Sequence, residues 1–428
     1  MPITRHLARC HALTIYNDEA PVSKLPMELL SEIFHIGLDE YDPDNHHAIK
    51  YLSTISSICS TWRGAALGTP SLWRCVTYDH DHDSHPRTKN STIPRHTTDR
   101  LIAYLSRSKS CGILLHLRFG AGPLGIRAIK RIVYPHLSRC LSIWLSFMSE
   151  HHMRDFLPLP GNLCRLTEFT CVSGQLDHSY FRSSGRAPPP IFAEPERVSL
   201  RKLILERCRP SPDSINVQDL EDVRMTRIYD SWPKGLTFIS QSHSLATLIT
   251  TAFNFFGQEQ PPFTLPNLMY LDTVGFTMLK VAHTPNLQTL VLTDIGGDEF
   301  ADTVVRLPSL PALTTLCVIF GDLTSERITG LLALNNGIRR LMLSHCAGIS
   351  DLVWSLQADD TGSPANTRDT MLLPSLSLLQ VCRSSVPDAG RFHPLFACRP
   401  MLRIEHGETD GPGYIDADGL KGVIEEFN

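Results

Sequence analysis

Aspartates and histidines alternate between Asp79 and His85, and this is the segment whose residue types and spacing are best suited to chemistry. Imidazole nitrogens and carboxylate oxygens are ligands for zinc and related ions. The segment is polar throughout, and no apolar framework in the neighbouring sequence would fix a closed coordination shell. We therefore predict a solvated loop and no metal site.

The other sequences that could carry catalysis are also weak. The neighbouring histidines of His46-His47 and of His151-His152 point apart on a helix or a strand, so neither pair forms a site. Gly296-Gly297 follows an expected strand but lacks the lysine of a phosphate-binding loop, which favours a turn. The chain has no Gly-x-Ser-x-Gly elbow, no Walker phosphate loop and no His-Glu-x-x-His sequence. The sequence therefore predicts a protein that is not an enzyme and binds no cofactor.

The composition further restricts the class of protein to which the chain can belong. The chain has 428 residues, of which 42% are hydrophobic and 20% are charged, and these values are typical of a folded protein with more than one domain. Its net charge of −4, without a basic field, argues against nucleic acid as a partner. No run of about 18 apolar residues indicates a membrane span. The 12 cysteines include no Cys-x-x-Cys pair, so we expect reduced thiols and a location in the cytoplasm or the nucleus.

Two apolar stripes at helical spacing lie within residues 25–67. In the first, Pro26 suits a first helical position and Glu28 suits the first turn, where the helix dipole favours a negative charge. The second stripe covers residues 49–67, and the sequence at 69–73 then turns the chain. The residues that form the stripes recur every three or four positions, and they are Leu29, Leu30, Ile33, Phe34, Ile49, Leu52, Ile55, Cys59 and Trp62.

Three sequences in this region occur in a specific order. They are Leu25-Pro26-x-Glu28-Leu29-Leu30-x-x-Ile33-Phe34, then Ile58-Cys59-x-x-Trp62-Arg63-x-x-Ala66, then Pro70-x-Leu72-Trp73. This order resembles the F-box, most closely that of F-box-like proteins in mushroom-forming fungi, although the loop at 39–48 is longer than in many F-boxes. The resemblance implies a Skp-type adaptor as partner and, through it, a cullin. By position it assigns adaptor contacts to Leu25, Pro26, Leu29 and Ile33, and the core of the module to Leu30, Phe34, Cys59, Trp62 and Trp73.

From residue 200 onward, an apolar phrase of the form Leu-x-x-Leu-x-Leu recurs. Most intervals between copies lie near the period of leucine-rich repeats, about 20–29 residues. Each copy would supply one strand whose apolar side has to be covered by neighbouring copies. The copies begin at Leu200, Leu220, Leu245, Leu268, Leu287, Leu313, Ile338 and Leu376, with weaker ones at Leu114 and Leu166; Pro266, Pro285, Pro311 and Pro374 each stand two residues ahead of a copy.

We therefore predict an α/β chain in which a three-helix F-box-like module precedes an irregular leucine-rich-repeat-like solenoid with a curved parallel sheet. Helices within the array are expected at 99–108, 125–134, 325–334 and 351–358, and loops at 182–195 and 358–370. The expected divisions are a flexible N-terminus at 1–20, the module at 21–78, a polar connector at 79–99 and the array at 100–428.

Side chains alternate along a strand, so the spacer residues of the phrase share one face of the sheet. This set mixes charged, aromatic and small polar groups, which suits a protein target better than a small apolar ligand. The target-binding candidates are Lys202, Arg224, Tyr270, Asp272, Thr289, Arg340, Met342 and Gln380.

Together these features predict the substrate-recognition subunit of a Skp–cullin–F-box ubiquitin ligase. The F-box would bind the adaptor, and the array would bind an unidentified protein target. Two alternatives stay open: an F-box scaffold or protein-binding repeat protein outside any ligase, and, less favoured, a hydrolase within the α/β body.

Overall fold

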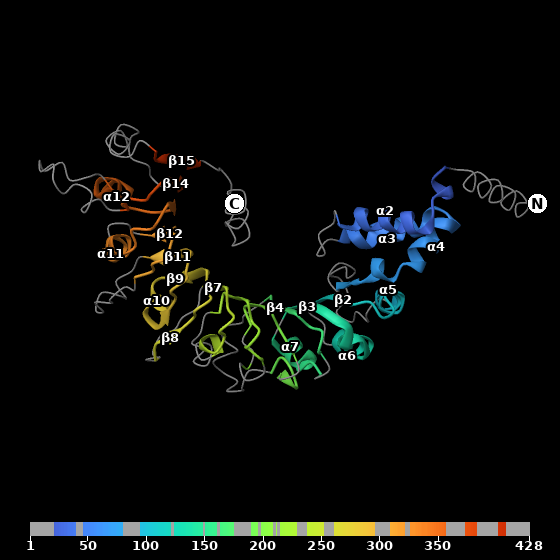
Figure 1. The fold of residues 1–428 in the computed structure, drawn as a ribbon. Coiled ribbons are helices and arrows are strands. Elements are labelled where there is room, and N and C mark those ends of the chain that lie inside the picture. Colours follow the sequence, from blue (N-terminus) through green and yellow to red (C-terminus); the bar gives the residue numbers. More distant parts are fainter. Residues whose placement is uncertain are drawn as a thin grey trace, which may run out of the picture. The chain divides into compact units, whose positions relative to one another are not determined.

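The structure is a computed structural model, and its chain forms two compact units, residues 1–258 and residues 259–428 (Figure 1). The expected flexible N-terminus (1–20), most of the connector (79–99) and the expected insertion (358–370) lie outside the described residues. The structure describes residues 21–39, 46–79, 95–120, 124–148, 150–160, 163–174, 190–195, 198–208, 211, 215–228, 238–251, 261–295, 309–321, 326–356, 373–382 and 401–407.

The first unit begins with a group of short helices. They are η1 (Pro21–Lys24), α2 (Met27–Asp39), α3 (His46–Ile58), α4 (Ser60–Gly68) and η2 (Pro70–Trp73). Cys59 caps α4, because its Sγ accepts a hydrogen bond from the backbone N–H of Trp62 at 3.5 Å. The core between the helices is apolar and fully closed to solvent, and it includes Leu30, Phe34, Leu52, Ile55, Ala65 and Ala66.

Parallel strands follow the helices in the first unit and pair in chain order. They are β1 (Cys75–Asp79), β2 (Ile113–Phe119), β3 (Cys140–Phe147), β4 (Glu168–Ser173), β5 (Lys202–Glu206), β6 (Asp222–Thr226) and β7 (Thr247–Thr251). Between them lie α5 (Arg95–Arg107), α6 (Leu124–Val133), η3 (Tyr134–Arg139) and α7 (Glu150–Phe156). The ring of Phe156 in α7 lies 5.1 Å from that of Phe119, so this helix packs on the apolar face at β2 and β3 (Figure 1).

The second unit repeats this arrangement. Its parallel strands pair in the order β9 (Tyr270–Val274), β11 (Thr289–Ile295), β12 (Thr315–Gly321), β13 (Arg340–Ser344), β14 (Leu378–Cys382) and β15 (Arg403–Gly407). The two-residue strands β8 (Phe263–Thr264) and β10 (Ala282–His283) pair separately. The helices are α10 (Thr277–Val281), α11 (Glu326–Leu334) and α12 (Ile349–Leu356). The predicted α/β class with a large parallel sheet is confirmed.

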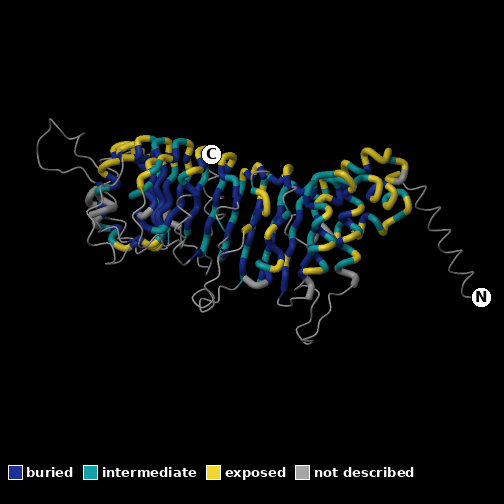
Figure 2. Tube along the Cα trace, turned by 90° about the horizontal axis from the view of Figure 1, so that it is seen from below, coloured by how far each residue is buried: buried dark blue, intermediate teal, exposed yellow. Residues whose placement is uncertain are grey.

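The recurring phrase explains where the strands form. Its first leucine stands just before a strand, and its second and third leucines are buried within the strand on one face, as Leu287, Leu290 and Leu292 show. Figure 2 shows such buried positions continuing from strand to strand within each unit. The prolines have a local reason as well. In Leu310-Pro311-Ala312-Leu313 the N–H of Leu313 bonds to the carbonyl of Leu310 at 3.0 Å, a turn whose second position favours proline.

Neighbouring copies are joined by a repeated backbone contact at the start of each strand. The N–H groups of Arg339 and Arg340 both donate to the carbonyl of Thr314, at 2.8 and 3.0 Å, and Ser377 and Leu378 donate in the same way to Arg339. Each copy therefore satisfies the backbone of the next one, so a single copy has no independent stability.

Asn335 makes a buried side-chain contact in the second unit, and Asn335→Ala tests it. Its Oδ1 accepts from the N–H of Leu310 and its Nδ2 donates to the carbonyl of Leu331, both at 2.6 Å. The variant leaves the buried N–H of Leu310 without this acceptor, so we expect a loss of about 1–3 kcal/mol in the free energy of unfolding, measured in urea. The exposed neighbour supplies the control, since Asn336→Ala should change stability by less than about 0.5 kcal/mol. Equal stabilities of the two variants would contradict this role.

Three strands of the long parallel series, β1, β3 and β15, have no predicted copy of the phrase. Strand β1 falls within the range assigned to the helical module, and it was missed because Cys75–Asp79 is short and has no leucine. Strand β15 was missed because only Leu402 and Ile404 of a copy are present there. The four expected helices within the array correspond to α5, α6, α11 and α12.

Candidate functional site

Helix α2 exposes an apolar face. Leu29 is 52% exposed, Ile33 is 45% exposed and Ile36 is 58% exposed, and their spacing of four and three residues places them on one side of the helix. The opposite side is closed, because Leu30 and Phe34 are 0% exposed. We call Leu29, Ile33 and Ile36 the α2 face. The helix therefore has a complete core on one side and an apolar surface on the other.

The residues predicted for adaptor contact lie at the start of α2 or on this face. Pro26, Leu29 and Ile33 are exposed, and Leu25 is half-buried. Ile36 was not among them, although the same helical spacing points to it. Of the predicted core residues, Leu30, Phe34 and Trp73 are buried, whereas Cys59 and Trp62 are half-buried. The rings of Phe34 and Trp62 lie 5.0 Å apart.

Polar contacts fix α2 against η2 and so orient the α2 face. The hydroxyls of Ser31 and Thr69 are 2.7 Å apart, and Nε2 of His35 is 2.9 Å from the hydroxyl of Ser71. Both pairs lie on the inner side of the helix. The α2 face is thus presented by a fixed helix.

The second candidate surface is the face of each sheet opposite the buried leucines, which we call the open face. In the first unit Lys202 and Arg224 are half-buried on this face. Nε and Nη2 of Arg224 each lie 3.2 Å from a carboxylate oxygen of Asp222, and Asp222 is the register partner of Lys202. The two predicted cations therefore share one carboxylate neighbour.

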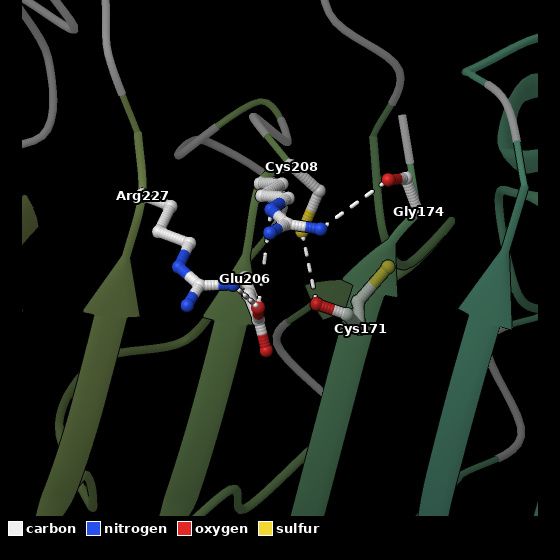
Figure 3. A network of polar contacts seen from close by, with 6 residues as sticks. Cys171, Gly174, Glu206, Cys208 and Arg227 are labelled. Carbon is white, nitrogen blue, oxygen red and sulfur yellow. Dashed lines mark hydrogen bonds and ion pairs between the residues drawn. The ribbon is translucent and has the colours of Figure 1, made fainter. Parts of the chain in front are cut away.

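A polar network lies at the carboxyl ends of β4, β5 and β6 (Figure 3). Oε1 of Glu206 lies 3.3 Å from Nη1 of Arg227 and 4.0 Å from Nε of Arg207. Nη1 of Arg207 also donates to the carbonyl of Gly174 at 3.3 Å. The Cys208 thiol donates to the carbonyl of Cys171 at 3.1 Å. Burial raises the pKa of Cys208 well above its ordinary value. The thiol is therefore protonated and unreactive.

On the open face of the second unit, the other candidates fall into two neighbouring rows. Tyr270, Thr289 and Arg340 belong to the first row, which runs through Thr315. The second row is Asp272, Val291, Cys317, Met342 and Gln380 in register order. Tyr270, Thr289, Arg340, Met342 and Gln380 are half-buried.

Asp272 departs from its predicted place on an accessible surface. It points to the open face but is only 5% exposed, because its row is apolar: Val291 and Cys317 form a buried cluster against which Tyr270 and Met342 pack. Burial raises the pKa of Asp272 from 3.8 to about 7. Burial, followed by the nearby charge of Asp272, also raises the pKa of the Cys317 thiol. Neither group suits a catalytic nucleophile.

One recurring backbone feature was not predicted from the sequence. A residue in the left-handed backbone conformation occurs at the same position after the start of several strands. The fifth residue after the first residue of a strand has positive φ, at Arg207 (52°), Arg227 (57°), Asp294 (57°), Phe320 (54°) and His345 (53°), and at Gly275 (59°). At Arg207, Arg227, Gly275 and His345 the N–H of this residue bonds to the next strand, as from Arg207 to the carbonyl of Thr226 at 3.0 Å. Non-glycine residues hold this conformation at a cost of about 1–2 kcal/mol each. Only the glycine at 275 could have signalled it in the sequence.

Residues 120–125, which run from the end of β2 into the start of α6, match Gly-x-Gly-x-x-Gly and were not among the predicted sites. In dinucleotide-binding proteins such a sequence holds a pyrophosphate at a point where the strand order reverses. Strands β1 to β7 follow one another without reversal, and residues 121–123 lie outside the described residues. The strand order around these glycines therefore differs from that of dinucleotide-binding proteins.

Over the described ranges, no three histidine, cysteine, aspartate or glutamate side chains are placed to hold a metal ion. Of the aspartate–histidine segment at 79–85, only Asp79 is described, and its carboxylate lies 3.9 Å from the guanidinium of Arg118. Within the part of the chain that the structure describes, no helix is long and apolar enough to cross a membrane.

Comparison of the sequence with protein-family models and with curated proteins finds no match to either.

Proposed function

We propose that this chain is the substrate-recognition subunit of a Skp–cullin–F-box ubiquitin ligase. The observation that carries the proposal is the α2 face. The described helices α2, α3, α4 and η2, in the region that resembles an F-box in sequence, enclose an apolar core, and they leave Leu29, Ile33 and Ile36 in solvent.

Exposure of this apolar face to water is unfavourable, and a bound partner would cover it. Three large apolar side chains on one helical stripe suit insertion into a groove of another protein. The exposed carboxylates of Glu28 and Glu32 lie in the same helix and would form a polar rim around that contact. The proposed partner at this face is the Skp-type adaptor.

The open faces of the two units supply the proposed second function, capture of a protein target. Their half-buried side chains include Arg224, Tyr270 and Met342, and these residue types are enriched at protein interfaces. The chain would act by position: holding a target lysine near the charged ubiquitin carrier raises its effective concentration. No bond is made or broken by the chain itself, and it would act in the cytoplasm or the nucleus.

A pull-down with the purified Skp-type adaptor tests the proposal. The wild-type chain should bind, and the double variant Leu29→Asp, Ile33→Asp should lose at least about 100-fold in affinity, because two carboxylates would have to be desolvated in an apolar groove. Ile102→Asp is the matched control, since Ile102 is a 49% exposed isoleucine of α5, outside the α2 face. It should bind like the wild type.

The assay has two outcomes that would reject the proposal. The folded wild-type chain could fail to bind the adaptor, or the double variant could bind as tightly as Ile102→Asp. Co-purification of a cullin with the bound adaptor separates a ligase subunit from an F-box scaffold outside any ligase.

A further inference from the structure

Phe320 combines two unfavourable properties in one residue. Its side chain is 53% exposed, and its backbone has a φ of 54°. An exposed aromatic ring gains little from the fold, and a left-handed backbone is disfavoured for a bulky residue. The equivalent position after β9 is Gly275, which carries no such disadvantage.

His345 repeats the pattern on the next strand. It is exposed, its φ is 53°, and its ring centroid lies 4.7 Å from that of Phe320, with the two planes tilted by 32°. Nδ1 of His345 is 3.1 Å from the hydroxyl of Ser344, which fixes the imidazole beside the phenyl ring. The two rings form an ordered aromatic surface at the carboxyl ends of β12 and β13.

The strand on the other side of Phe320 supplies a negative charge. Asp294 occupies the same repeat position on β11, is exposed, and has a φ of 57°. It directly follows Thr293, the register partner of Ile319, so its strand is the immediate neighbour of that of Phe320. The charge beside the phenyl ring is therefore acidic.

We propose that Asp294, Phe320 and His345 bind an arginine or lysine side chain of the protein target. A cation above the face of Phe320 is attracted by the ring quadrupole, and the Asp294 carboxylate can pair with the same cation. The strained backbone presents all three side chains at one edge of the sheet. The proposal rests on the proposed function only in taking the bearer of the cation to be the ligase target.

The test uses the full chain and a fluorescent peptide of alternating glycine and arginine, followed by anisotropy at low ionic strength. A second peptide carries citrulline in place of arginine, because citrulline keeps the shape and removes the charge. We expect binding of the citrulline peptide to be weaker by at least about tenfold. Phe320→Ala and Asp294→Asn should each weaken binding of the arginine peptide by roughly fivefold to tenfold.

Two controls separate recognition from folding. Met269→Ala removes another large exposed side chain of the second unit, which is 47% exposed, and should leave the affinity unchanged. Phe320→Gly should melt at or above the temperature of the wild type, because glycine adopts positive φ without strain.

Equal affinities for the two peptides, or unchanged binding by Phe320→Ala, would overturn the proposal. So would a large loss of thermal stability in Phe320→Gly, since the ring would then serve the fold. The assay contains no adaptor, and the Phe320 variants should still bind the adaptor, so failure here is distinguishable from failure of the proposed function.

Discussion

Trp73→Ala should lower the free energy of unfolding of the first unit by about 3–5 kcal/mol. Trp73 is among the largest side chains in the chain that are fully buried, with 1% exposure. Truncation to alanine removes the indole and leaves a cavity that the surrounding helices cannot fill. The loss should be among the largest of any single substitution outside the leucine rows.

The contacts of Trp73 explain why the effect extends beyond the N-terminal helices. Its Nε1 donates to the carbonyl of Ala66 in α4 at 2.7 Å. Its ring meets that of Tyr104 edge-on, with centroids 4.9 Å apart, and the guanidinium of Arg107 lies 4.4 Å from its centroid. Tyr104 and Arg107 belong to α5, so one side chain joins the N-terminal helices to the first helix that follows β1.

Urea unfolding followed by circular dichroism measures the loss. Trp73→Phe should have an intermediate effect, since it keeps a ring against Tyr104 but lacks the donor to Ala66. Trp144→Ala is the control, because Trp144 is half-buried on the open face and stacks on His116, and it should cost about 1 kcal/mol. If Trp73→Ala and Trp144→Ala lowered the free energy of unfolding by similar amounts, the contacts of Trp73 would not hold the N-terminal helices against α5.

The leucine phrase predicted β5, β6, β7, β9 and β11 to β14, but not the two-residue strands β8 and β10, because its physical cause is local. Each strand needs two apolar side chains on one face and a turn before them, and both requirements appear within six residues, as in Leu287 to Leu292. Strand β1 has no such signal, and it forms because β2 offers its backbone to Cys75–Asp79. Pairing between distant segments cannot be read from five residues alone.

The α2 face could be foreseen in part, because helical spacing separates Leu29 and Ile33 from Leu30 and Phe34. The residues with left-handed backbone conformation at the ends of the strands could not be foreseen. Arginine and phenylalanine do not indicate positive φ, yet Arg207 and Phe320 both adopt it. The arrangement of Asp294, Phe320 and His345 is therefore found from the structure and not from the residue types.

The burial of Asp272 was also hidden in the sequence. Alternation places it correctly on the open face, but its surroundings come from other copies, since Val291 and Cys317 lie beside it across two neighbouring strands. A carboxyl group placed among such neighbours is disfavoured in its charged form. This placement has a measurable consequence for stability.

The free energy of unfolding of the wild type should fall as pH rises from about 4 to about 7. The pKa of Asp272 is raised from 3.8 to about 7 by burial, so in this interval the folded chain keeps a proton that the unfolded chain has released. Stability decreases with pH wherever the folded state binds more protons, by at most about 1.4 kcal/mol per pH unit for one group. Asp272→Asn removes the titrating group, so it should flatten this slope and be more stable than the wild type at pH 8 by about 2–4 kcal/mol.

Urea unfolding at a series of pH values, compared between the wild type and Asp272→Asn, measures this difference. A slope that persists in Asp272→Asn would assign the titration to another group. If the slope is lost, the apolar row around Val291 and Cys317 tolerates the aspartate only at a cost to stability, and retention of a destabilising residue on the open face is expected where function requires it.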